Sequence, residues 1–333
     1  MNIFISIILP VRNEEKYITE CLDSILNSDY QKDLIEVIVV DGDSTDNTLN
    51  IVREYESKYD FIKVIINKRR IVPISLNLAI KDSKGDYIVR IDAHCHYPRN
   101  YFSKLVFWAE KLGADNVGAV IETDVLFKNK TSVSIKIVMS DILGVGDSLF
   151  RLGINSPKIV DTVPFGCFKK SVFEKFGNFD ERLVRCQDIE FNKRIKGLGA
   201  EIYLIPDNNV VYYARETYRE LFINRYETGK WVVRTICLTR SFASFGVRHL
   251  VPTLFVTSIL FLLLLSIFFS QCLLLLSGQI LLYFLILFIR SLYIYDGTTP
   301  FHVVNAFLVL HISYGVGSLV SIFSCLHNNN KVR

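Results

Sequence analysis

Charged side chains are nearly missing from one end of this chain of 333 residues. Of its 72 charged residues, four lie in the last 85 positions: Arg290, Asp296, Lys331 and Arg333. Over the whole chain the two signs almost balance, since 38 basic and 34 acidic residues leave a net charge of +4, which argues against a nucleic-acid-binding protein. An apolar content of 50% excludes a fully disordered chain.

Several common motifs are also missing. The seven cysteines form no C-x-x-C pair and no zinc-type spacing, so we expect reduced thiols in a cytosolic domain. The first apolar run, Ile3 to Leu9, is followed by PVRNE and not by G-x-G-x-x-G, which disfavours a dinucleotide-binding loop. The same run is too short to span a bilayer and lacks a basic flank. We therefore expect a buried strand there and no signal peptide.

The uncharged end is long enough for membrane helices. Residues 250–289 are forty positions without a charge, which suits two helices at 250–269 and 272–290. A third candidate covers 301–325, and it contains His311, which either has a function or packs against small residues. A buried helix pair is the alternative for the first two, and a re-entrant segment for the third. Arg248 and Arg290 flank the first two helices, so the positive-inside rule places both in the cytosol.

A basic segment precedes the first of these helices. Residues 215–248 carry seven Arg or Lys residues against three Glu, with aromatic residues between them. This composition predicts amphipathic helices on the inner leaflet, and an ordinary solvated helix face is the alternative.

The charged part of the chain alternates apolar runs with amphipathic stretches. Strands are predicted at 3–9, 36–40, 62–66 and 87–91, with helices at 14–26, 45–59 and 73–81. The strands are almost continuously apolar, which is typical of a sheet covered by helices on both faces. We therefore predict an α/β fold with a doubly wound, mostly parallel sheet, whose ligands bind at the carboxyl ends of the strands.

Polar residues stand at those strand ends. Asp41 follows the second strand and is placed to accept hydrogen bonds from a base or a ribose, whereas Asp43 to Asp46 are better explained by helix capping and turn formation. Asp92 and His94 follow the fourth strand, and a carboxylate with an imidazole suits Mn²⁺ well and Mg²⁺ tolerably. A strand-ending Asp with a surface His is the equally favoured alternative. Asp188 opens a later helix, either as a general base or as a charge favoured by the helix dipole.

These segments together resemble glycosyltransferase family 2, whose members have the GT-A fold. The resemblance covers Ile5 to about Arg234 and rests on PVRNEE at 10–15, VDGDSTD at 40–46, SLNLA at 75–79, DAH at 92–94, VPFGCF at 163–168, GNFDE at 177–181 and QD at 187–188. The most similar subgroup is the membrane-anchored transferases of the succinoglycan-biosynthesis type, through NKRRIVP at 67–73, RIDAH at 90–94 and HISYGVG at 311–317.

The resemblance implies roles for individual residues. Those implied to bind the nucleotide-sugar are Pro10, Arg12, Glu14, Asp41, Arg70 and Asp92. Asp92 and His94 would bind the divalent metal, Mn²⁺ or Mg²⁺, and Asp188 would be the catalytic base. The acceptor region would include Gly166, Gln187, Arg225, Lys230 and Trp231.

Two departures from the family pattern accompany these roles. His94 stands where the family's D-x-D motif ends, and Gln187 replaces the usual Glu before Asp188. The Q-x-x-R-W signature of processive synthases is matched only loosely around Arg225 to Trp231, so we expect one sugar to be transferred per acceptor.

The resemblance implies a membrane-anchored, inverting and metal-dependent hexosyltransferase of exopolysaccharide biosynthesis. Its donor would be a nucleotide-sugar, most simply a UDP-sugar, and its acceptor a glycan on a polyprenyl diphosphate. A non-catalytic scaffold subunit with the same fold is the alternative. We expect a cytosolic GT-A domain at 1–214, a basic interfacial segment at 215–248 and a transmembrane region at 249–333. The protein would cross the cell (inner) membrane several times, with its catalytic domain in the cytoplasm.

Overall fold

The computed structural model describes residues 2–242 and 246–329 and divides into two compact units. The first consists of Met1–Glu122 with Leu149–Tyr212, and the second of Thr123–Ser148 with Tyr213–Arg333. Residues 243–245 of the predicted interfacial segment, and the terminal Lys331 and Arg333, lie outside the described residues.

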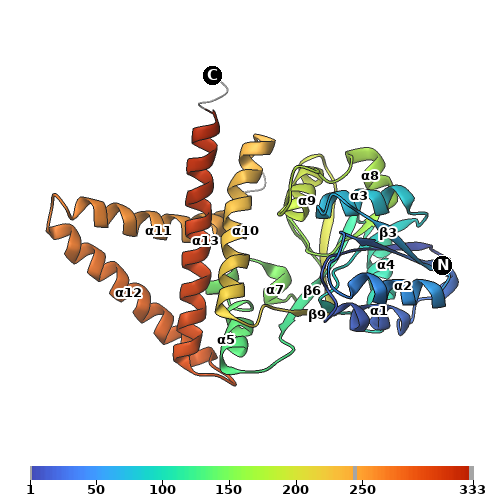
Figure 1. Cartoon of the computed structure of the whole chain (residues 1–333), viewed down its shortest axis with the longest axis horizontal. Helices are drawn as coiled ribbons and strands as arrows, with labels where there is room; N and C mark the ends of the chain where they lie inside the picture. Colours follow the sequence, from blue (N-terminus) through green and yellow to red (C-terminus); the bar gives the residue numbers. More distant parts are fainter. Residues whose placement is uncertain (1, 243–245, 330–333) are drawn as a thin grey trace. The chain divides into compact units, whose positions relative to one another are not determined.

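A mixed sheet forms the centre of the first unit (Figure 1). Its strands are β1 (Ile5–Val11), β2 (Ile35–Asp41), β3 (Ile62–Ile66), β4 (Tyr87–Arg90), β5 (Cys95–His96), β6 (Asn116–Asp124), β7 (Lys158–Ile159), β8 (Cys167–Lys169) and β9 (Ile202–Tyr213). They follow the order β3-β2-β1-β4-β8-β6-β9-β5, with β7 beside β9. The pairs among β1 to β4 are parallel, whereas β8 is antiparallel to both β4 and β6.

Helices cover both faces of this sheet (Figure 1). One face packs against α1 (Ile18–Leu26), α2 (Thr48–Lys58) and α4 (Tyr101–Leu112). The other packs against α3 (Val72–Asp82), α8 (Lys170–Phe176) and α9 (Gln187–Gly197). Two short helices, η1 (Lys32–Leu34) and α7 (Leu149–Leu152), lie in the connections.

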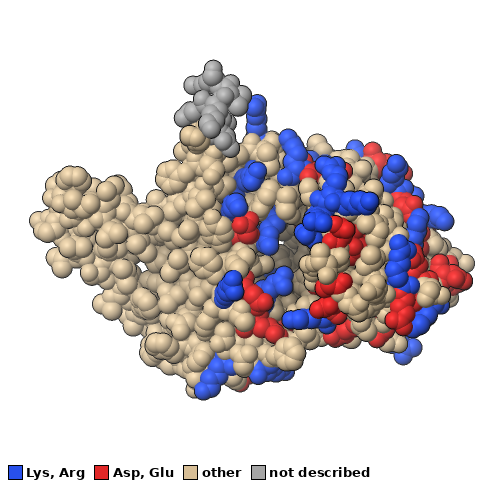
Figure 2. All heavy atoms as spheres, in the orientation of Figure 1, with Lys and Arg blue, Asp and Glu red and all other residues tan. Residues whose placement is uncertain are grey.

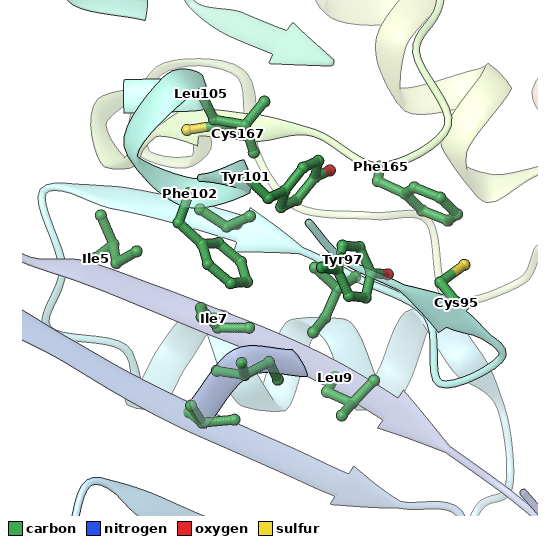
Figure 3. Close-up of a cluster of buried hydrophobic side chains, with 14 of the residues drawn as sticks. Ile5, Ile7, Leu9, Cys95, Tyr97, Tyr101, Phe102, Leu105, Phe165 and Cys167 are labelled. Atoms are coloured by element: carbon green, nitrogen blue, oxygen red, sulfur yellow. The ribbon is translucent and has the colours of Figure 1, made fainter. Parts of the chain in front are cut away.

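The apolar pattern explains this two-faced arrangement. Ile7 and Ile8 are neighbours in β1, yet both are fully buried, because alternate side chains enter the two core clusters on opposite faces. In α1 the buried positions Ile18, Leu22 and Ile25 recur at helical spacing and face β1. Figure 3 shows part of this cluster, with Ile5, Ile7 and Leu9 of β1 beneath the rings of Tyr97, Tyr101 and Phe102.

The prediction of an α/β fold with a doubly wound sheet is confirmed. The predicted strand at 62–66 is β3, and the other three predicted strands agree with β1, β2 and β4 to within two residues. The predicted helix at 14–26 begins later, at Ile18, because residues 12–17 form the turn that follows β1.

Long helices dominate the second unit. It contains α5 (Lys130–Val138), α6 (Ile142–Val145), α10 (Tyr218–Thr239), α11 (Val247–Leu265), α12 (Gln271–Ile294) and α13 (Pro300–Asn329). Among the described residues, three helices are long and apolar enough to cross a membrane: Arg248–Leu265, Gln271–Ile294 and Pro300–His327. They agree with the three predicted apolar segments.

The expectation of seven reduced thiols is wrong for one pair. Cys237 near the end of α10 and Cys325 near the end of α13 form a disulfide, with their Cα atoms 6.5 Å apart. The two helices run parallel, so their C-terminal ends lie side by side. The spacing of the cysteines along the sequence does not reveal this contact. The remaining five cysteines are free, and Cys21, Cys95 and Cys167 are buried in the sheet unit.

Candidate active site

The carboxyl ends of the parallel strands bring several predicted residues to one edge of the sheet. β1 and β2 end in register at Val11 and Asp41, and β4 ends beside β1. The loops that follow contain strained backbone, because Asn13, Asp43 and Arg70 all have positive φ values of 55–59°. Non-glycine residues seldom adopt this conformation, and where they do they gather at functional sites.

Asp41 anchors the loop that follows β2. It is completely buried, and its two carboxylate oxygens accept hydrogen bonds from the backbone N–H of Ser44 at 2.9 Å and the Ser44 hydroxyl at 2.6 Å. Ser44 Oγ in turn accepts the N–H of Asn13, at 3.0 Å. Asp41 therefore fixes the β1 and β2 loops to each other.

Asp92 is held by a core tyrosine. The fully buried Tyr97, seen in Figure 3, accepts the backbone N–H of Asp92 at 2.9 Å and donates its hydroxyl to the Asp92 carbonyl at 3.0 Å. The backbone of Asp92 is thus hydrogen-bonded to the core, while 21% of its side chain is exposed. A rigid main chain and a partly exposed carboxylate are what a ligand-binding residue requires.

A buried arginine joins Asp92 to Asp188. Arg90 Nη2 lies 2.8 Å from Asp92 Oδ1 and 3.6 Å from Asp188 Oδ2. The guanidinium also donates to the Pro164 carbonyl at 3.1 Å and lies over the Phe165 ring, 5.3 Å from its centre. Its Nε finds no hydrogen-bond partner among the described residues, although it is buried. No motif in the sequence assigns Arg90 a role. A lone charge in the apolar strand Tyr87–Arg90 was the available signal.

The carboxyl group of Asp188 has a raised pKa that lies close to neutral pH. Asp188 lies in the first turn of α9, which begins directly after Cys186, whose φ is +63°, and the preceding residue Gln187 is buried. Burial raises its pKa to about 6, the Arg90 guanidinium opposes the rise, and the negative charge of Asp92 adds to it. A carboxylate with this pKa is mostly ionised at pH 7 and accepts a proton more readily than an ordinary aspartate.

His94 forms a pair with Glu14 from the β1 loop. His94 Nδ1 lies 3.3 Å from Glu14 Oε1, and the ring packs edge-on against Tyr212, 5.0 Å between centres. Burial lowers the pKa of His94, but the Tyr212 and Glu14 interactions and the charge of Asp92 outweigh it and bring that pKa to about 9. Because Nδ1 faces Glu14, Nε2 is the ring nitrogen left for a ligand, and it has to lose its proton before it can bind a metal.

His94 is held by Glu14, and only 16% of its side chain is exposed. Histidines that bind metals usually donate their other ring N–H to a carboxylate, which orients the free nitrogen. No group of three or more His, Cys, Asp and Glu side chains in the described part of the chain is arranged to hold a metal ion alone. The Asp92 carboxylate and the His94 imidazole are donor types that divalent metals accept, and a metal bound here would need further ligands from a bound molecule.

The other predicted residues lie in several places. Pro10 is in β1, the exposed Arg12 begins the loop after it, and Arg70 forms an ion pair with Asp43, joining the loops after β3 and β2. A side chain at Gly166 would collide with the Phe168 ring, and its carbonyl accepts the N–H of Arg90 at 2.8 Å. The acceptor residues Arg225, Lys230 and Trp231 lie in α10 of the second unit.

Comparison with known proteins agrees with this geometry. The sequence model described as Glycosyl transferase family 2 matches residues 6–176. A Methanococcus voltae enzyme named dolichyl N-acetyl-α-D-glucosaminyl phosphate 3-β-D-2,3-diacetamido-2,3-dideoxy-β-D-glucuronosyltransferase is 31% identical over 227 residues, which cover 65% of this chain and 69% of that protein. The succinoglycan biosynthesis protein ExoA of Rhizobium meliloti is 28% identical over 250 residues, covering 74% of this chain and 73% of the relative.

A solved structure supports the fold. The mannosyltransferase PcManGT from Pyrobaculum calidifontis, determined with GDP-Man and Mn²⁺, superposes with a TM-score of 0.66 over 96% of this chain and 87% of its own, at 19% identity. With the sheet, the strand-end carboxylates and a sequence match over more than half of its length, the chain belongs to glycosyltransferase family 2 and has the GT-A fold.

Proposed function

We propose that this family 2 enzyme is a membrane-attached, inverting transferase that moves a sugar from a UDP-sugar onto a lipid-linked glycan. The observation that carries the proposal is the Asp92–Arg90–Asp188 arrangement at the carboxyl ends of the strands. It places a base of raised pKa and a carboxylate for the donor on either side of one buried cation. A fold retained only for scaffolding has no need of such an arrangement.

The reaction is one in-line displacement at the anomeric carbon. The acceptor oxygen forms a bond to that carbon while the bond to the diphosphate oxygen breaks, and the configuration inverts. Asp188 takes the hydroxyl proton, and the nucleoside diphosphate leaves with the bonding electron pair. General-base assistance of this kind typically contributes 10² to 10⁴ in rate.

The nucleotide is proposed to lie across the loops after β1, β2 and β3. Pro10, Arg12, Glu14 and Asp41 face the base and ribose in this proposal, and Arg70 lies near the phosphates. The strained backbone at Asn13, Asp43 and Arg70 supports it, because such loops are kept where a ligand needs them. Solved relatives of this fold carry UDP-GlcNAc in one case and GDP-Man in another, so the choice of UDP is left to experiment.

A divalent metal is proposed to bind with the donor, held by Asp92 and His94. Its chemistry is to neutralise the charge on the departing diphosphate. Glu14 then acts on His94 and orients the imidazole. Mn²⁺ suits this mixed oxygen and nitrogen donor set better than Mg²⁺ does.

The acceptor is proposed to be presented at a membrane. Apolar helices in the second unit support this, as does a relative that is named for a dolichyl sugar phosphate. In this proposal residues 1–214 carry the chemistry, 215–248 meet the bilayer surface and 249–333 attach the chain. Gly166 and Gln187 are proposed to face the acceptor in the sheet unit, and for Arg225, Lys230 and Trp231 of α10 the acceptor role stays a prediction from the sequence.

The proposal is tested with the full-length chain in detergent or vesicles. UDP-glucose, UDP-galactose, UDP-N-acetylglucosamine and GDP-mannose are supplied in turn with Mn²⁺, Mg²⁺ or EDTA, and release of the nucleoside diphosphate is measured. We expect turnover with one UDP-sugar, lost in EDTA and restored by Mn²⁺. If no nucleotide-sugar binds or turns over, the chain is a scaffold and the proposal fails.

A further inference from the structure

The charges of α10 limit where its neighbour α13 can lie. α10 carries four basic and two acidic residues between Arg219 and Arg234, namely Arg219, Glu220, Arg225, Glu227, Lys230 and Arg234. They occupy about four turns of the helix, a length of roughly 23 Å. Charges are rare and costly in bilayer hydrocarbon, so a helix with this distribution does not cross a membrane.

α13 runs alongside α10 from end to end. Near their beginnings the Tyr218 hydroxyl donates to the His302 carbonyl at 3.0 Å, and near their ends Cys237 is bonded to Cys325. Between these points the backbones are in close contact, because a side chain on Gly229 or Gly317 would collide with the main chain of the other helix. If α13 crossed a bilayer, α10 and its charges would cross with it.

The α11–α12 hairpin contacts α13 through the part of the hairpin farthest from its turn, which we call the base: the start of α11 and the second half of α12. Gly315 of α13 lies against Pro252 and Val256 of α11, and His311 contacts the Tyr283 hydroxyl of α12 at 2.8 Å. Nearer the base, Arg290 forms an ion pair with Asp141 at 2.6 Å. Figure 1 shows α11 and α12 leaving α13 and meeting at a distant tip, and Figure 2 shows no Lys, Arg, Asp or Glu on this face of the projecting part.

The projecting part is apolar and uncovered. Most of the large apolar side chains from Leu260 to Leu275 are about half to three-quarters exposed, and at the tip Ile267 and Phe268 are each 74% exposed. Leu262 and Leu265 are partly buried. The turn itself offers Ser266, Ser270 and Gln271 as its only polar side chains. A loop that emerges into water on the far side of a membrane is normally far more polar than this.

The length of the projection matches one leaflet. α11 continues for nine residues beyond Val256, and α12 takes twelve to run from Gln271 to Tyr283. At 1.5 Å per residue these segments reach roughly 14 and 18 Å. The hydrocarbon core of a bilayer is about 30 Å thick, so the tip reaches its middle.

We propose that the chain is monotopic: the α11–α12 hairpin inserts into one leaflet of a lipid bilayer, and α10 and α13 lie together at the surface of that leaflet. This rests on the proposed membrane attachment and replaces the three membrane crossings that hydropathy predicts. Both ends of the hairpin, the sheet unit and the C-terminus then stay on one side of the membrane.

The test maps which side each part of the full-length chain occupies. A C-terminal epitope tag is combined with Ser57→Cys on the exposed side of α2 or with Ser270→Cys at the tip, in sealed membrane vesicles of both orientations. A membrane-impermeant maleimide reports the cysteines above the background of the unsubstituted chain, and added protease reports the tag. We expect Ser57→Cys and the tag to be reached from the same side, and Ser270→Cys only after detergent is added.

Each other pattern overturns the proposal in a recognisable way. Labelling of Ser270→Cys from the side opposite Ser57→Cys means that the hairpin crosses the bilayer. A tag on the side opposite Ser57→Cys means that α13 crosses it. Release of the unsubstituted chain by a carbonate wash means that membrane attachment itself has failed.

A matched pair of substitutions tests the depth of the tip. Phe268→Arg places a charge where we expect hydrocarbon, whereas Phe107→Arg places one at an exposed phenylalanine of the sheet unit. We expect Phe268→Arg to weaken partitioning into vesicles of neutral phosphatidylcholine by about tenfold or more, and Phe107→Arg to leave it unchanged. Equal partitioning of the two variants places the tip in water and overturns the proposal.

Discussion

At the residue scale, Arg90 sets the charge balance of the proposed site. A buried cation lies between two carboxylates and offsets their charge, and it links the base on α9 to the donor carboxylate after β4. The sequence indicated both carboxylates from their places after a strand and at the start of a helix. Their link was hidden, because Arg90 and Asp188 are 98 residues apart and no pattern marks the contact.

The pKa of Asp188 predicts an acidic limit to activity. The base is ionised above its pKa of about 6 and protonated below it. We therefore expect kcat/KM to fall about tenfold per pH unit below pH 6. Asp188→Asn should lower turnover by about 10² to 10⁴ at pH 7.5, abolish the acidic limb and leave UDP binding unchanged, with surface Asp82→Asn as the control. Wild-type turnover in Asp188→Asn would remove the residue from the proposed role.

Arg90 should control the pH at which activity falls, the acidic limb of the pH–rate profile. Its guanidinium lowers the pKa of Asp188 against the effect of burial, so Arg90→Met should raise that pKa and move the acidic limb to higher pH. The same change leaves two carboxylates without their cation and should destabilise the fold by about 3–5 kcal/mol. Arg90→Lys keeps the charge and should keep the limb nearly in place. Thermal unfolding and pH–rate profiles of both variants measure the two effects, and an unmoved limb in Arg90→Met contradicts the assignment.

Glu14 should act on the metal through His94. Glu14→Gln weakens the acceptor of the Nδ1 proton, so we expect Mn²⁺ affinity, measured with UDP at a concentration that saturates each variant, to fall by about 10- to 100-fold. Electron paramagnetic resonance of free Mn²⁺ measures this without turnover. The chain offers a matched control, because Glu20 and His96 form a pair with the same 3.3 Å separation on the surface. If Glu20→Gln and Glu14→Gln lower the affinity equally, Glu14 has no special part in the site.

At the element scale, the local sequence pattern predicts the parallel strands of the sheet well and its antiparallel strands poorly. Strands β1 to β4 are continuous apolar runs followed by turns, so periodicity finds them. β5, β7 and β8 have two or three residues each and are positioned by pairing with longer strands, so they carry no periodicity of their own. Among the helices, α10 was predicted from its basic composition, but its pairing with α13 depends on glycine contacts that hydropathy ignores.

Those contacts yield a stability prediction. A Cβ at Gly317 would lie 2.0 Å from the Tyr226 carbonyl oxygen, and main chain cannot move aside as a flexible side chain does. Gly317→Ala should force α13 from α10 and destabilise the second unit by about 1–3 kcal/mol. Gly278→Ala in α12 meets nothing within 4 Å and should be neutral or slightly stabilising. Thermal unfolding of the two full-length variants decides, and equal melting temperatures would contradict the close packing.

At the scale of the whole molecule, composition locates the membrane-seeking part but not its topology. The lack of charge after Arg248 correctly marks three apolar helices. Hydropathy treats each helix separately, however, and α13 differs from the other two in its surroundings. Half of its most apolar window is buried in protein, against 17% for α11 and 11% for α12. Burial against a charged neighbour is a property of the folded unit, so the sequence alone could not separate an anchoring hairpin from a third crossing.

This division predicts that location and chemistry can be uncoupled. Replacing residues 257–282 by a short Gly-Ser linker removes the projecting hairpin and leaves the base that packs on α13. We expect the shortened chain to leave the membrane in a carbonate wash, to keep hydrolysing its nucleotide-sugar, and to lose transfer to a lipid-linked acceptor in vesicles. Transfer to a water-soluble analogue of that acceptor should survive, because the Asp92–Arg90–Asp188 arrangement lies in the sheet unit. If the shortened chain stays bound to vesicles, the attachment lies in α10 and its basic residues, and raising the salt concentration should then release it.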